Sequence, residues 1–126
     1  MEIAILGYRR ERRDEVEEGL RFCLGRDSPI LLRQYGMEEP LYNDVPKETV
    51  AAFIIVEDAK ALITANKAAQ REKNLPLVIV SNHPQYAVEG IRLQVRHYIL
   101  FPLEQEDIRE ALRRIGLEVT QEWEKS

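Results

Sequence analysis

The sequence has one cysteine, two histidines and no long apolar run among its 126 residues. Cys23 has no second cysteine with which to form an internal disulfide, which fits a reducing compartment. Met1 leads into a short apolar run rather than a signal-peptide core, and no run has the length needed to cross a bilayer. We therefore expect a cytoplasmic protein that has no membrane partner.

A large excess of charge of one sign is also lacking, because the formal net charge is only −4. Such a chain has no overall field that attracts nucleic acid or anionic lipid. The arginine cluster at residues 9–13 is interleaved with and followed by acidic residues, which is typical of a solvated helix face. We expect no direct binding of nucleic acid.

Motifs for catalysis and metal binding are missing as well. The sequence contains no Gly-rich phosphate loop, nucleophile elbow or Ser/His/Asp arrangement. His83 and His97 have no cysteine or acidic residue at ligand spacing, so we expect no metal and no cofactor. These absences favour a protein that is not an enzyme.

Apolar runs and helical repeats alternate five times along the chain. Runs of strand character occupy residues 2–6, 29–35, 50–56, 75–80 and 97–101. Apolar residues at helical spacing follow the first, third, fourth and fifth runs, and Asp58 is placed to cap the helix after the third. Residues 37–49 are rich in turn formers and predict a loop with at most a short helix.

The later strands are apolar throughout, which is typical of strands buried on both faces. Short links that join parallel strands through helices give a three-layer α/β/α sandwich around one parallel sheet. Gly116 closes the last helix, so we expect this domain to span residues 1–116. Residues 117–126 lack clear periodicity and are expected to form a C-terminal extension or the start of a linker.

The stretch 75–112, which begins LPLVIVSNHPQYAVEG, resembles without a gap the second half of a response-regulator receiver domain. The runs MEIAIL and AAFIIVE fit the first and third strands of that family. The similarity is greatest to receivers that precede LytTR-type DNA-binding domains, where a Tyr-Ala pair opens a helix and Tyr-Leu-Leu-Lys-Pro ends the fifth strand. This resemblance implies the flavodoxin-like strand order 2-1-3-4-5 and a role in two-component phosphorelay signal transduction.

Receivers accept a phosphoryl group on an aspartate after the third strand. An acidic pair holds Mg²⁺, a Thr or Ser contacts the phosphoryl group, and a lysine neutralises it. Carried over by position, the resemblance places the phospho-acceptor at Glu57, the hydroxyl at Ser81 and the lysine at Phe101. The acidic pair falls on Gly7 and Tyr8. Only Ser81 is a standard residue at its position.

The resemblance thus implies a degenerate site made of Glu57 with Gly7, Tyr8, Asp58, Ser81 and Phe101. Glu57 either mimics the phosphorylated form or is a solvated acid at a strand end. A register with Asp58 as the acceptor would bury Glu57 in an apolar run, which costs several kcal/mol, so we prefer Glu57. We expect Phe101 to be more than half buried beside Tyr8 and Glu57.

Tyr98 occupies a position where receivers often carry an aromatic residue that turns between exposed and buried states on activation. Its alternative interpretation is a packed aromatic beside the last helix. The same part of the chain carries polar residues of both charge signs that we expect on one face. These are Gln85, Glu89, Arg92, Arg96, Asp107, Glu110 and Arg114.

Two functions follow from these observations. The favoured one is an atypical receiver, or pseudo-receiver, that acts by protein–protein interaction without conventional aspartate phosphorylation. Its partner would be another protein or a second copy in a weak homodimer, and a fused output domain would make it a transcription regulator. The alternative is a small-molecule sensor whose pocket is lined by Tyr8, Glu57 and Phe101.

Overall fold

The computed structural model describes residues 1–36, 48–71 and 74–117. The loop expected at 37–49 therefore lies almost entirely outside the described residues. The described elements, in chain order, are β1 (Glu2–Leu6), α1 (Arg10–Leu24), β2 (Leu31–Tyr35), β3 (Thr49–Ile55), α2 (Ala59–Arg71), β4 (Leu77–Ser81), α3 (Tyr86–Arg92), β5 (His97–Leu100) and α4 (Gln105–Arg114).

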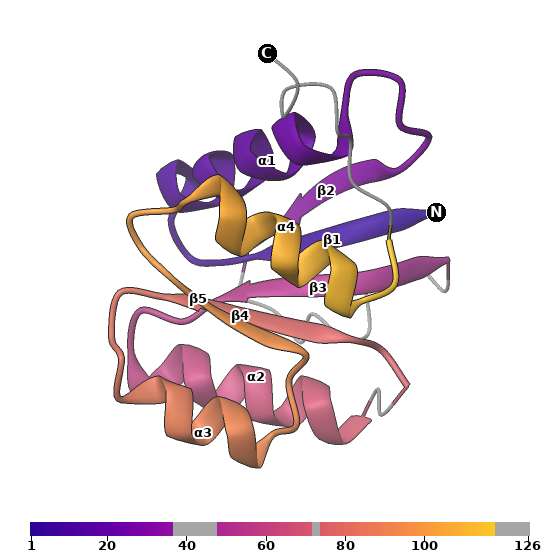
Figure 1. Cartoon of the computed structure of the whole chain (residues 1–126). Helices are drawn as coiled ribbons and strands as arrows, with labels where there is room; N and C mark the ends of the chain where they lie inside the picture. The colour runs from indigo at the N-terminus through magenta and orange to yellow at the C-terminus, as the bar shows by residue number, and fades with distance from the viewer. Residues whose placement is uncertain (37–47, 72–73, 118–126) are drawn as a thin grey trace.

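The five strands form one parallel sheet in the order β2-β1-β3-β4-β5. Helices α1 and α4 lie on one face of this sheet, and α2 and α3 lie on the other (Figure 1). The predicted three-layer α/β/α architecture and the strand order 2-1-3-4-5 are both confirmed. None of the helices in the described ranges combines the length and apolar character needed to cross a bilayer.

Alternate strand residues feed two separate apolar clusters, one on each face of the sheet. We call them the α1 cluster, which includes Ile3, Leu20 and Phe53, and the α2 cluster, which includes Ala4 and Ile54. All five of these residues are at most 1% exposed. Because side chains alternate across a strand, a residue's cluster tells which face of the sheet it occupies.

The predicted helix ends match the structure closely. The Ala61 amide donates a hydrogen bond of 2.8 Å to Asp58 Oδ1, so Asp58 caps α2 as expected. Gly25 follows α1 with a φ of 90°, a conformation that favours glycine. Cys23 is fully buried on α1, and burial is the main cause that raises the pKa of its thiol.

Two strands begin later than the apolar runs predict, and a proline precedes each. The runs start at 29 and 75, whereas β2 begins at Leu31 and β4 at Leu77. Pro29 and Pro76 have no backbone N–H, so neither can donate to a neighbouring strand. Pro76 contributes only its carbonyl, which accepts a 3.0 Å hydrogen bond from the Ala52 amide.

Candidate functional site

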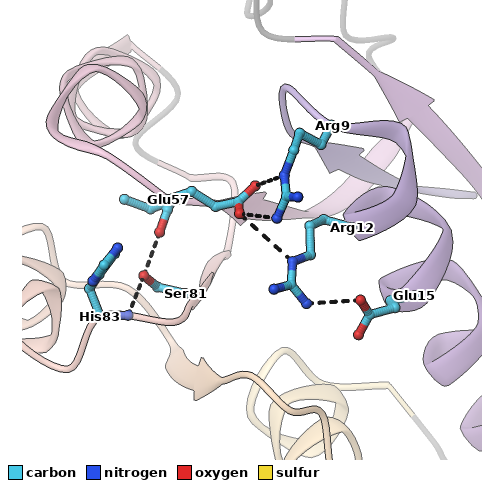
Figure 2. Close-up of polar contacts among 7 residues, drawn as sticks. Arg9, Arg12, Glu15, Glu57, Ser81 and His83 are labelled. Carbon is cyan, nitrogen blue, oxygen red and sulfur yellow. Dashed lines mark hydrogen bonds and ion pairs between the residues drawn. The ribbon is translucent and has the colours of Figure 1, made fainter.

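Glu57 lies two residues beyond the end of β3, at the edge of the sheet where α/β proteins usually bind ligands. Its side chain is 18% exposed. Arg9 engages both carboxylate oxygens, with Nε 3.2 Å from Oε1 and Nη2 2.6 Å from Oε2 (Figure 2). This two-point geometry is the strong form of an arginine–carboxylate pair. The charge of Glu57 also raises the pKa of Arg9, after the hydrogen bond itself.

A second guanidinium reaches the same carboxylate from the next turn of α1. Arg12 Nε lies 3.7 Å from Glu57 Oε2, and Arg12 Nη1 lies 2.9 Å from Glu15 Oε1. The Arg12 guanidinium also stacks over the Phe101 ring, with Cζ 4.2 Å from the ring centroid. Phe101, to which the resemblance assigned the receiver lysine, packs against a cation and carries none itself. The positive charge beside Glu57 comes from α1.

Gly7, to which the resemblance assigned the first acid of a receiver, leaves little space for a side chain. A Cβ atom at Gly7 would lie 3.0 Å from Ile55 Cδ1 and 3.2 Å from Ile55 Cβ, which is too close without a shift. Arg13 Nη1 donates to the carbonyl oxygens of Gly7 at 2.7 Å and Tyr8 at 3.3 Å. An aspartate at position 7 would therefore require the Ile55 side chain to shift by a few tenths of an ångström.

The arginines that make these contacts lie at the beginning of α1, where their charge is unfavourable. Helix N-termini carry partial positive charge and favour acidic residues, yet four of the five residues from Arg9 to Arg13 are arginine. Arg9 is the N-cap residue and its side chain makes no capping hydrogen bond. The residues that break local preferences are often functional. Three of the four arginines, Arg9, Arg12 and Arg13, make contacts at the carboxyl edge of the sheet.

Ser81 and Tyr98 form a hydrogen-bond chain next to Glu57. The buried Ser81 hydroxyl donates a hydrogen bond to the Val56 carbonyl (Figure 2). It also accepts a hydrogen bond of 3.0 Å from the His83 amide. The Tyr98 hydroxyl donates to the His83 carbonyl. Burial is the main cause that raises the pKa of Tyr98, and the nearby Ser81 hydroxyl opposes the rise. Tyr98 is therefore turned inward and tied to the loop after β4.

The structure separates some of the residues that the sequence analysis grouped together. Asp58 uses its carboxylate to cap α2. Tyr8 packs against the α2 cluster and Phe101 against the α1 cluster, so the two rings lie on opposite faces of the sheet. Phe101 is partly buried, as expected, but it lies beside Arg12 and not beside Tyr8. In the described ranges no three His, Cys, Asp or Glu residues cluster to hold a metal ion.

Arg9 and Arg12 are the site residues that the sequence analysis missed. Their interleaving with acids indicated a solvated face, and only the structure shows two of the side chains turned toward Glu57. A usable signal was present, since a run of arginines is unfavourable at a helix N-terminus.

The polar residues expected on one face are largely paired within their own helices. Glu89 pairs with Arg92 at 3.5 Å, and Glu110 pairs with Arg114 at 2.8 Å. The hydrogen bond from Arg114 is the main cause that lowers the pKa of Glu110. Val88, three residues after Gln85 and four before Arg92, is 64% exposed on the same helical stripe.

Comparisons with known proteins identify the fold. No protein-family model and no curated protein matches the sequence. A response regulator receiver protein from Pseudoalteromonas atlantica matches the structure with a TM-score of 0.72 at 12% identity, over 91% of this chain and 96% of that one. The fold is that of receiver domains.

Two further neighbours show the range of proteins with this fold. The REC domain of AraT, a response regulator from Geobacillus stearothermophilus, has a TM-score of 0.67 at 20% identity, over 98% of this chain and 95% of that one. The pilus assembly protein CpaE from Caulobacter crescentus CB15 has a TM-score of 0.62 at 21% identity, over 86% and 94%. The receiver fold therefore occurs in this set both in response regulators and in a pilus assembly protein.

Proposed function

We propose that this chain is an atypical receiver, a pseudo-receiver that signals by protein–protein interaction without conventional aspartate phosphorylation. One observation carries the proposal. Glu57, at the position equivalent to the phospho-acceptor, already has both carboxylate oxygens bound by Arg9, with Arg12 beside it. The proposal includes no catalytic role, metal or cofactor.

The chemistry of phosphoryl transfer explains why this pairing matters. An attacking carboxylate must be free to approach phosphorus, and cations must screen the charge of the incoming phosphate. Arg9 occupies the carboxylate instead, and Gly7 carries no acid and leaves little space for one beside Ile55. Under this proposal the internal guanidinium groups permanently take the place of metal, phosphate and lysine.

The contacts of Tyr98 and Ser81 support a single maintained state. The Ser81 hydroxyl donates to the Val56 carbonyl just after β3, and the Tyr98 hydroxyl donates to the His83 carbonyl in the β4–α3 loop, so both donors are already engaged. A module of this kind would be controlled by its expression, a partner or a fused neighbour. If a LytTR-type or other output domain follows residue 126, the function becomes transcription regulation.

The proposed interaction face consists of α3, β5 and α4, and its partner is another protein or a second copy of this chain. Charge pairs across a two-fold axis would compete with the pairs already formed within α3 and α4. Val88 and Leu100 are 64% and 39% exposed, and they offer the apolar contact that such a face needs. We therefore expect a weak homodimer whose affinity depends more on these two residues than on the charges.

The alternative, a small-molecule sensor lined by Tyr8, Glu57 and Phe101, has less support. Tyr8 and Phe101 pack on opposite faces, and arginines occupy the carboxylate between them. A saturable rise in melting temperature with a small molecule, lost on substitution of Glu57, would favour the sensor over the interaction module.

Attempted phosphorylation tests the proposal directly. We expect that acetyl phosphate with Mg²⁺ will leave the intact mass of the protein unchanged, and that beryllofluoride will give no bound signal in a fluorine NMR spectrum. A phosphorylatable receiver handled in parallel serves as the positive control. An acid-labile phosphoryl adduct on Glu57 or Asp58 would overturn the proposal.

A further inference from the structure

A second carboxylate–arginine pair lies at the opposite end of the sheet. Glu2 is the first residue of β1, and the residue is only 3% exposed. Its Oε1 atom lies 2.9 Å from Arg33 Nε on β2. Its Oε2 atom is buried and has no hydrogen-bond partner within the described part of the chain. Buried carboxylate oxygens are normally bonded, so this atom requires an explanation.

Two buried hydroxyl groups without partners accompany it. Thr49 is the register partner of Glu2 on β3, and the pairing shifts after Glu2 so that Val50 packs against the α1 cluster. Thr49 therefore faces the same side as Glu2, and its Oγ1 is buried and unbonded among the described residues.

Tyr35 ends β2 and is the register partner of Leu6, so it approaches from further along the same face, and its hydroxyl is also buried without a standard hydrogen bond among the described residues. Burial first, and then the charge of Glu2, raises the pKa of Tyr35, while the charge of Arg33 and the approach of its guanidinium to the hydroxyl oppose the rise, so Arg33 lies close to this hydroxyl without a hydrogen bond of standard geometry.

The sheet beneath these groups is built from small side chains. Ala4 on β1 is the register partner of Ala52 on β3 and of Arg33 on β2. Both alanines belong to the α2 cluster and are at most 3% exposed. The methyl groups of Ala4 and Ala52 therefore lie next to Glu2 and Thr49 on the same buried face. Unsatisfied buried polar groups of this kind are usually satisfied by an ordered water molecule or another small hydrogen-bonding group.

We propose that Glu2, Thr49 and Tyr35 bind a small neutral hydrogen-bond donor, an O–H or N–H group. A carboxylate oxygen only accepts hydrogen bonds, whereas hydroxyl groups both donate and accept. Arg33 already balances the charge of Glu2, so the occupant need not be a cation. Two sources supply this chemistry, an ordered water molecule and the hydroxyl or amide group of a neutral organic ligand. The site is separate from Glu57, because Glu2 and Thr49 are the first residues of their strands, whereas Glu57 follows the end of β3.

The sign of a stability change tests the site. The double variant Thr49→Val and Tyr35→Phe removes both hydroxyl groups and keeps the side-chain shapes. If the hydroxyls have a bound partner, the melting temperature falls by more than in the control Thr64→Val, which removes a hydroxyl bonded to the Lys60 carbonyl. If they are unbonded, their removal relieves a desolvation cost. A melting temperature equal to or above that of the wild type would overturn the proposal.

Two measurements on the wild-type protein identify the source. Cross-relaxation between water and the Ala4 and Ala52 methyl groups is expected if the occupant is an ordered water molecule. A retained extra mass under non-denaturing mass spectrometry, absent from the double variant, is expected if it is an organic ligand. Either result supports the site, and the absence of both would refute it.

Discussion

The two ends of the sheet hold the same pair of residue types in opposite conditions. At the carboxyl edge, the Glu57 side chain is 18% exposed and both of its oxygens are bonded by Arg9. At the amino end, the Glu2 side chain is 4% exposed and only one oxygen is bonded by Arg33. The more accessible carboxylate is fully satisfied by the protein, and the buried one is not.

This difference distinguishes a charge pair that occupies an accessible carboxylate from one that stabilises the fold. A pair near solvent contributes little to stability, because water screens and competes for both partners. Its effect at Glu57 is to engage both carboxylate oxygens, which under the proposed function blocks phosphorylation. A pair whose carboxylate is buried matters much more for stability, because removing the partner leaves an uncompensated charge.

The largest expected effect is therefore at the amino end. We predict that Arg33→Ala lowers the free energy of unfolding by about 2 kcal/mol, below the full cost of breaking a buried pair because Arg33 is 58% exposed. Urea denaturation at neutral pH measures the change.

The matched control is Arg9→Ala, which removes the same side chain from the other carboxylate. Its effect on stability should be clearly smaller and should shrink further at high salt. Equal losses for the two variants would contradict the contrast between the two ends of the sheet.

The next largest effect on stability is expected for substitution of Phe101, at the carboxyl edge of the sheet. Phe101→Lys introduces the residue that the resemblance to receivers predicts at this position. It also removes the ring that packs on the α1 cluster and sets an ammonium beside Arg12. We predict a loss of about 1–2 kcal/mol in the free energy of unfolding. Phe101→Leu keeps the apolar contact and should lose less. An unchanged melting temperature for Phe101→Lys would argue that the ring has no supporting role.

The sequence predicted the fold well because the deciding signals are local. Continuous apolar runs such as 50–56, helical spacing, and the cap at Asp58 each depend on neighbours in the chain, and the structure agrees with them. The flavodoxin-like order required the resemblance, since periodicity does not reveal which strands pair.

The candidate site was only partly predictable, because its contacts join distant parts of the chain. Glu57 could be placed at a strand end, but its partner Arg9 lies 48 residues away. Glu2 was read simply as part of an apolar strand. A single acid at the start of a strand carries no signal that it will be buried beside Thr49, because that depends on a register shift between β1 and β3.

Association is expected to be a weaker effect than either change in stability. Exposed pairs contribute about 0–1 kcal/mol each, and those of α3 and α4 are already formed within each helix. We predict that Val88→Lys weakens the homodimer more than Arg92→Glu or Arg114→Glu does, as measured by sedimentation at several salt concentrations. A strict monomer at high concentration would exclude the homodimer, and a dimer insensitive to all three substitutions would place its interface elsewhere.

The smallest expected effect is the pH response of His97, the first residue of β5 and so at the same end of the sheet as Glu2. Burial is the main cause that lowers the pKa of His97, and Arg114 lowers it further, while Glu110 and Asp107 oppose the change. Below the ordinary pKa of 6.5, the unfolded chain therefore binds a proton that the folded protein does not. As the pH decreases from 6.5, the free energy of unfolding decreases as well, until the pH is below the pKa of His97 in the folded protein. Melting temperatures between pH 7.5 and 5 should decline less steeply in His97→Gln than in the wild type. The arginines keep their charge throughout this pH range, so they do not contribute to the slope. Equal slopes of melting temperature against pH in the two proteins would show that a group other than His97 causes the response.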